Sequence, residues 1–109
     1  MSDIYTSGRW QPNPGSEAQF VEAWKDFATW ASSMPGAGTL RLLHDLDDPG
    51  RFVSYGNWES ADAVAGWKSS DEFRGRMANI LQYVAVFEPT ESAVVADAAA
   101  GTVTTHAAV

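Results

Sequence analysis

The 109-residue chain contains no cysteine and two histidines, His44 and His106. Without cysteine there is no disulfide framework, no thiolate metal site and no cysteine nucleophile. The histidines lie far apart, and neither belongs to a His-x-x-x-His or Glu-x-x-His pattern, so we expect no metal site. No serine stands in a nucleophile elbow, and a Ser/His/Asp triad would depend on His44 alone.

Positive charge is also scarce. Seven lysines and arginines stand against 14 acidic residues, for a net charge of −7, and the cations are scattered along the chain. Binding to nucleic acid or to an anionic membrane requires clustered lysine and arginine, so we expect neither partner. No glycine-rich phosphate loop is present, since the Gly-Ala-Gly stretch at residues 36–38 is too short and precedes a strand. We therefore expect no nicotinamide, flavin or other cofactor.

Long apolar runs are missing as well. No stretch approaches the roughly 20 residues of a membrane span, and residues 1–5 lack the regions of a secretory signal. These absences predict a soluble cytoplasmic protein. A chain of 109 residues forms one domain with a single modest core. Its five tryptophans are many for that core, so we expect some of them in an interface or a ligand pocket.

Breaker residues divide the chain into alternating strands and helices. Strands are predicted at residues 4–11, 39–45, 51–58 and 83–89. The link between the second and third strands is a short turn rich in aspartate, which predicts an antiparallel pair. Its carboxylates, at residues 45, 47 and 48, lack the spacing of a calcium loop, so we interpret them as a solvated turn.

Two helical regions lie between these strands. The first begins at a capping-box spacing, Ser16 to Gln19, and ends by residues 34–36. Its apolar stripe consists of Phe20, Trp24, Phe27 and Ala31.

The second helical region is broken. A short helix runs from a cap at Ser60 to about Trp67, and a capping-box spacing from Ser69 to Glu72 starts another. The second apolar stripe consists of Phe73, Met77, Ile80, Leu81 and Val84.

The resulting order, β-α-β-β-α-β, predicts an α+β fold of the ferredoxin-like type, an antiparallel sheet with helices on one face. Apolar residues point to both faces of the strands, as Leu42 and Leu43 do. The face without helices should therefore be buried by a second copy, in a homodimer with facing sheets. We place the domain at residues 1–91. In the extension, 92–109, residues 92–95 can add an edge strand, including one on a partner subunit, and a flexible tail follows.

Four polar residues on the predicted strands are candidates for chemistry. His44 is the candidate proton acceptor, because imidazole titrates near neutral pH; the alternative is a structural strand histidine. Tyr55 and Asn57 share a face and are catalytic candidates that orient a polar substrate group, or else they serve cross-strand packing. Arg41 is a candidate to stabilise the negatively charged oxygen of a deprotonated substrate, an enolate; the alternative is an exposed salt bridge.

One segment resembles a known family, the antibiotic biosynthesis monooxygenases, and the likeness extends over residues 4–90. Its most specific residues are Trp58, Glu59, Ser60, Trp67, Ser70, Asp71, Glu72 and Phe73. The resemblance implies a dimeric α/β barrel and a cofactor-independent monooxygenase of aromatic or polyketide-like molecules. With Arg41, the substrate-binding candidates are Trp67, Phe73, Met77 and Trp24.

Two branches of that family share only the tryptophan with this chain. In the heme-degrading branch the proximal histidine falls on Met77 and a first-strand asparagine falls near Gly8, so we expect no heme breakdown. In the quinone-forming branch an asparagine falls on Ala63. Two functions stay open: an oxygenase, and a non-catalytic dimeric barrel that binds an apolar small molecule or has a stress or scaffold role. A cavity with convergent polar groups near Trp67 would favour the first.

Overall fold

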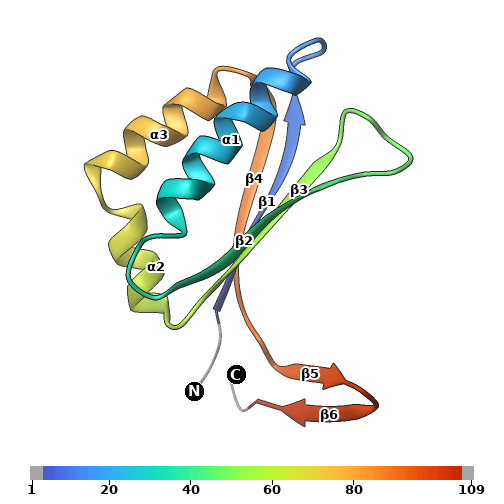
Figure 1. The fold of residues 1–109 in the computed structure, drawn as a ribbon, viewed down its shortest axis with the longest axis vertical. Helices are drawn as coiled ribbons and strands as arrows, with labels where there is room; N and C mark the ends of the chain where they lie inside the picture. The colour runs from blue at the N-terminus through green and yellow to red at the C-terminus, as the bar shows by residue number, and fades with distance from the viewer. Residues whose placement is uncertain (1–3, 107–109) are drawn as a thin grey trace.

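Residues 4–106, which the computed structural model describes, form a four-stranded antiparallel sheet, three helices and a terminal hairpin (Figure 1). The elements are β1 (Ile4–Pro12), α1 (Glu17–Ala31), β2 (Ala37–His44), β3 (Phe52–Trp58), α2 (Ala61–Lys68), α3 (Asp71–Leu81), β4 (Val84–Ala93), β5 (Ala96–Ala99) and β6 (Thr102–Thr105). The sheet order is β2-β3-β1-β4, and every neighbouring pair is antiparallel. The predicted ferredoxin-like arrangement is confirmed.

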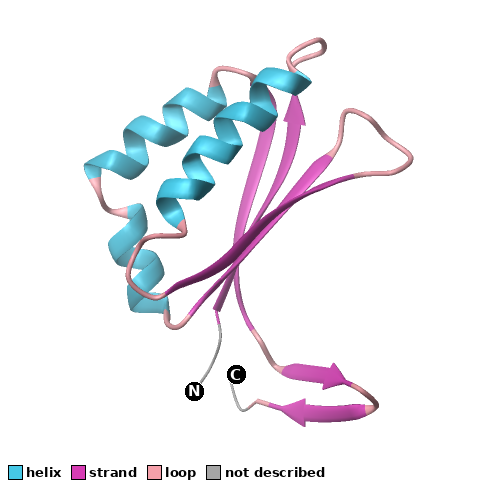
Figure 2. Cartoon of the chain, in the orientation of Figure 1, coloured by secondary structure: helices cyan, strands magenta, loops and turns pink. Residues whose placement is uncertain are grey.

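All three helices cover one face of the sheet (Figure 2). Side chains alternate along each strand, and the even-numbered residues of β1 and β3 point toward the helices. Trp10, Phe52 and Trp58 lie in the core, with 4%, 3% and 1% of their surface exposed. The odd-numbered residues lie on the opposite face, where Tyr5 and Tyr55 are 39% and 44% exposed.

The apolar stripes predicted for the helices meet this core. The four stripe residues of α1, Phe20, Trp24, Phe27 and Ala31, are all buried. On α3, Met77 and Ile80 are buried, but Leu81 is 41% exposed. No helix within residues 4–106 is long and apolar enough to cross a membrane.

The helix starts differ in part from those predicted. Ser60 caps α2 as expected, and its hydroxyl accepts from the backbone N–H of Ala63 at 3.1 Å. The cap of α3 is Ser70 rather than Ser69, because Ser69 still belongs to the end of α2. The capping box at Ser16 is wrong: within the described residues its side chain makes no capping hydrogen bond.

The C-terminal predictions also need correction. Strand β4 does not stop at Pro89 but continues to Ala93, taking in the first residues of the predicted edge strand. Pro89 lies opposite Gly8, and in the described sheet β4 borders only β1. A proline is tolerated in such an edge strand because the ladder does not need its missing N–H.

The tail predicted to be flexible forms a hairpin within its described part. Strands β5 and β6 pair in antiparallel register and project away from the two layers (Figure 1). Ala100 and Gly101 between them have φ angles of 51° and 81°. Two successive positive φ values are typical of the tight turns that join hairpin strands. Residues 107–109 of the predicted tail lie outside the described residues.

The two serines at helix starts give a matched test of these caps. Ser60→Ala should lower the free energy of unfolding by about 1 kcal/mol, because it removes a capping hydrogen bond. Ser16→Ala should change it by less than about 0.5 kcal/mol, since no capping bond is lost. Urea melts at one fixed protein concentration measure both. Equal losses in the two variants would contradict the assignment of the caps.

Candidate functional site

A cavity of about 540 Å³ lies between the sheet and the helices. Seven aromatic residues line it: Trp10, Trp24, Phe27, Tyr55, Trp67, Phe73 and Phe87. Its exposed lining residues include Arg74 and Leu81 of α3 and Pro89 of β4. The mouth of the cavity therefore lies between α3 and β4, and its inner wall is aromatic.

Glycines on two neighbouring strands keep the floor of the cavity open. A Cβ atom at Gly8 would lie 2.9 Å from both the Phe87 ring and Trp10 Nε1, and one at Gly56 would lie 3.0 Å from Leu40. Without a Cβ at Gly8, the rings of Trp10 and Phe87 stack with centroids 4.0 Å apart. Small residues thus let large rings lie flat against the sheet, which leaves space above them.

Trp67 is fixed at the inner wall by the break between α2 and α3. Its ring stacks on Trp58, with centroids 4.5 Å apart, and meets the edge of Phe73 at 4.9 Å. Its carbonyl accepts from the Ser70 hydroxyl at 2.8 Å, while the same hydroxyl accepts from the Phe73 N–H. Only 5% of Trp67 is exposed, so this ring has little freedom to turn.

The indole N–H of Trp67 is the polar feature that sets this wall apart. Trp10 Nε1 donates to Ser54 Oγ at 2.9 Å, and Trp58 Nε1 donates to Thr6 Oγ1 at 3.2 Å. Trp67 Nε1 is buried and has no hydrogen-bond partner within residues 4–106. A buried donor without an acceptor costs about 1–3 kcal/mol. The nitrogen has almost no exposed surface, so an oxygen of a ligand in the cavity would reach it only if neighbouring side chains moved.

Four of the predicted substrate-binding residues come together here. Trp67, Phe73, Met77 and Trp24 all line the cavity. Tyr55 also borders the cavity. As an odd-numbered residue of β3 it points to the face without helices, so its main chain, and not its ring, forms part of the wall.

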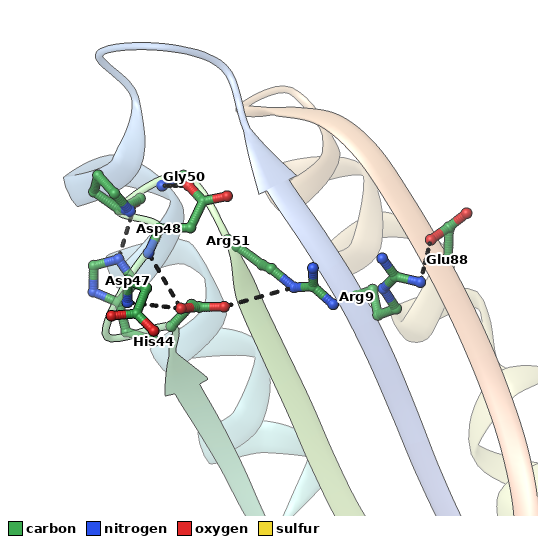
Figure 3. Close-up of polar contacts among 9 residues, drawn as sticks. Arg9, His44, Asp47, Asp48, Gly50, Arg51 and Glu88 are labelled. Carbon is green, nitrogen blue, oxygen red and sulfur yellow. Dashed lines mark hydrogen bonds and ion pairs between the residues drawn. The ribbon is translucent and has the colours of Figure 1, made fainter.

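Three other candidates lie outside the lining of the cavity. His44 Nε2 is 2.9 Å from the Pro49 carbonyl oxygen beside the β2–β3 turn (Figure 3), and its ring stacks on Phe52. Asn57 Oδ1 accepts from the Thr39 N–H at 2.9 Å. Arg41 is exposed on the face without helices. The fold thus does not bring His44 or Asn57 to the described lining of the cavity.

The aspartates of that turn bond to their own loop. Asp45 Oδ1 accepts from the N–H groups of Asp47 and Asp48, at 2.8 and 3.1 Å, and Asp48 Oδ1 accepts from Gly50 at 2.9 Å (Figure 3). Such bonds between an aspartate and nearby backbone are typical of turns. Across residues 4–106, no cluster of three His, Cys, Asp or Glu side chains could hold a metal ion.

Sequence reasoning did not single out Thr6, Ser54, Lys68 and Arg74, which supply polar groups to the cavity. Ser54 lies two residues from both Phe52 and Gly56, so strand alternation places it on the helix-covered face. Lys68 and Arg74 directly follow Trp67 and Phe73 along the chain. Strand alternation for Ser54, and proximity in sequence to Trp67 and Phe73 for the two cations, were the features of the sequence that could have indicated these residues.

The lining residues do not fit heme as the heme-degrading branch would hold it. No histidine is among the described lining residues, and Met77, on which the resemblance places the proximal histidine, is a buried residue of the lining. Gly8, on the floor, offers no side chain in place of the asparagine.

Three solved structures illustrate the shared fold. SnoaB, a cofactor-independent oxygenase from Streptomyces nogalater, is 17% identical over 84% of this chain and 92% of its own, with a TM-score of 0.78. Rv0793 from Mycobacterium tuberculosis is 16% identical over 89% of this chain and 99% of its own, with a TM-score of 0.78. A conserved protein from Methanosarcina mazei is 15% identical over 84% of this chain and 92% of its own, with a TM-score of 0.77.

At these identities the structural likeness shows the fold alone. A search of curated proteins finds no match to the chain. The family model described as antibiotic biosynthesis monooxygenase matches residues 4–78, which contain most of the sheet, the helical break and Trp67. The chain therefore belongs to the antibiotic biosynthesis monooxygenase family.

Proposed function

We propose that the protein is a cofactor-independent monooxygenase that acts on an aromatic or polyketide-like small molecule bound in this cavity. The observation that carries the proposal is the buried Trp67 N–H, which lacks an acceptor among the described residues and lies in a wall of aromatic rings. A flat ligand can stack on these rings, and a small shift of the neighbouring side chains would bring one of its oxygens to the Trp67 N–H. Family membership and the fold shared with SnoaB are consistent with this proposal.

The proposed reaction uses the substrate's own electrons. An anthrone loses a proton from its CH₂ carbon, the resulting enolate passes one electron to O₂, and the two radicals join to form a carbon–oxygen bond. Loss of water from the hydroperoxide then gives a quinone, so that CH₂ and O₂ become C=O and H₂O. A hydrogen bond that strengthens as the enolate oxygen gains charge lowers the barrier to deprotonation.

The chain's contribution is stabilisation of this anion. Trp67 Nε1–H donates to the enolate oxygen, and the Ser54 hydroxyl, which already accepts from Trp10, is available to donate to a second oxygen. No histidine, aspartate or glutamate is among the described residues of the lining, so the proton passes to water at the mouth.

Since no carboxylate or imidazole is found among the lining residues within 4–106, a second candidate function is also favoured. A barrel that only binds an apolar small molecule needs the cavity and the Trp67 donor but no proton acceptor. The two functions differ in turnover and not in binding.

An oxygen electrode separates these functions. With an anthrone as substrate and no added metal or cofactor, we expect one O₂ consumed for each anthraquinone formed. Trp67→Phe should lower kcat/KM roughly 10- to 100-fold, because a hydrogen bond to a charged oxygen contributes about 1.5–3 kcal/mol. The control is Trp30→Phe, since Trp30 does not line the cavity. Binding of the anthrone without O₂ uptake would support the second function.

The two substitutions at Trp67 should differ in stability. Trp67→Ala should lower the free energy of unfolding by about 3–5 kcal/mol, because a buried indole is replaced by an empty space. Trp67→Phe should cost less, since it keeps an aromatic ring and breaks no hydrogen bond with the described residues. Thermal and urea melts measure both, and equal losses would argue that the stack on Trp58 requires the whole indole.

We further propose a homodimer in which the faces without helices meet. Tyr5, Leu43, Tyr55 and Val86 point to that face and are 39%, 49%, 44% and 43% exposed. Sedimentation equilibrium at micromolar concentration should give about twice the chain mass of 11.8 kDa. Leu43→Asp should shift the protein toward monomer, because it places a charge in the apolar contact, whereas Asp62→Asn on α2 should not. A wild-type monomer would refute this arrangement.

A further inference from the structure

The charged side chains of the cavity all have one sign. The chain has 14 acidic and seven basic residues. Yet the charged side chains among the described lining residues are Lys68 and Arg74. In a protein with a net charge of −7, a wall with cations and no carboxylate favours an anionic ligand over a neutral one.

Both cations lie beside the aromatic wall and toward solvent. Lys68 follows Trp67 at the end of α2, and its side chain is 30% exposed. Arg74 follows Phe73 on α3, and its side chain is 78% exposed. Lys68 and Arg74 line the same cavity as Trp67 and Phe73, so a ligand that contacts these two rings also lies beside residues that carry positive charge.

The present partners of the cations leave room for such a ligand. Arg74 contacts Asp71 at 3.2 Å, but the Asp71 side chain is 98% exposed, so the pair is weak and easily exchanged. Lys68 Nζ lies 2.8 Å from Glu91 Oε2, whose side chain is 49% exposed. An ammonium group has three N–H donors, so Lys68 can bind a second carboxylate without losing the first.

We propose that the ligand of this cavity is an aromatic molecule that carries a carboxylate, with its rings against Trp67 and Phe73 and its carboxylate at the mouth between Lys68 and Arg74. This inference rests on the proposed function, because it places that function's substrate in the same cavity. It concerns a permanent charge at the mouth, which is separate from the transient enolate next to Trp67 Nε1.

Two matched probes test the inference, anthraquinone-2-carboxylate and its neutral carboxamide. Trp10, Trp24 and Trp67 line the cavity, so quenching of tryptophan fluorescence reports the binding of either probe. At low salt the carboxylate should bind about 5- to 10-fold more tightly than the carboxamide. The preference should shrink as salt rises, because exposed charges are screened.

Substitutions then assign the preference to the two cations. Lys68→Met and Arg74→Met should each reduce the ratio of the two affinities, and the double variant should bring it close to one. Lys25→Met is the control, since Lys25 forms a similar exposed pair with Glu22 on α1 but does not line the cavity. Glu91→Gln should increase the ratio, because it removes a negative charge beside Lys68 that repels the carboxylate of the probe.

The outcomes distinguish this inference from the proposed function. Equal affinities of the two probes, or an unchanged preference in the double variant, would overturn the carboxylate assignment and leave an aromatic-binding cavity. Failure of both probes to bind would overturn the inference together with the proposed function. If Lys68 only tied α2 to β4, Glu91→Gln would leave the ratio unchanged, and that result would also count against the inference.

Discussion

The stack of Trp67 on Trp58 is the contact on which the rest of the site depends. Trp58 is 1% exposed at the end of β3, and its Nε1 donates to Thr6 on β1, so its ring is tied to two strands. Trp67 reaches this ring from α2 at a centroid distance of 4.5 Å. The contact joins the helical break to the sheet and sets the plane of the Trp67 indole. This packing therefore offsets the energetic cost of burying the Trp67 N–H, which has no acceptor among the described residues.

A cavity forms here, rather than a filled core, because large and small residues are separated between the two layers. The helices contribute rings, as do Trp10 and Phe87 on the strands, while Gly8 and Gly56 of the sheet contribute no side chain. Rings lying on glycines cannot fill the space above them, whereas a leucine at either glycine would project into it. The high tryptophan content follows from this arrangement, since Trp10, Trp24 and Trp67 serve the cavity and Trp58 supports it from behind.

Periodicity was enough to predict the order of the elements and the buried face of α1, because both depend on burial repeated over many residues. Single-residue features were less predictable. Ser16 has the spacing of a capping box, yet capping depends on a side-chain rotamer that the spacing does not determine. Pro89 is compatible with a strand only because β4 lies at the edge of the sheet, which is a tertiary fact. The β5–β6 turn needs a positive φ at Ala100, which alanine rarely adopts, so composition indicated a flexible tail instead.

Whether a residue lines the cavity could be predicted where the sequence indicated both the face of the helix or strand on which it lies and its position along that element. Trp67 satisfied both through the family resemblance and the helical break. Tyr55 has the wrong strand parity, since Phe52 and Trp58 define the helix-covered face and an odd-numbered residue between them points away. His44 has the right parity, for it pairs with Phe52, but it lies at the far end of β2. Parity can be deduced from a sequence once one buried residue of a strand is known. How close a strand residue lies to the break between α2 and α3 depends on how the helices pack across the sheet. This packing places Ser54 in the lining of the cavity.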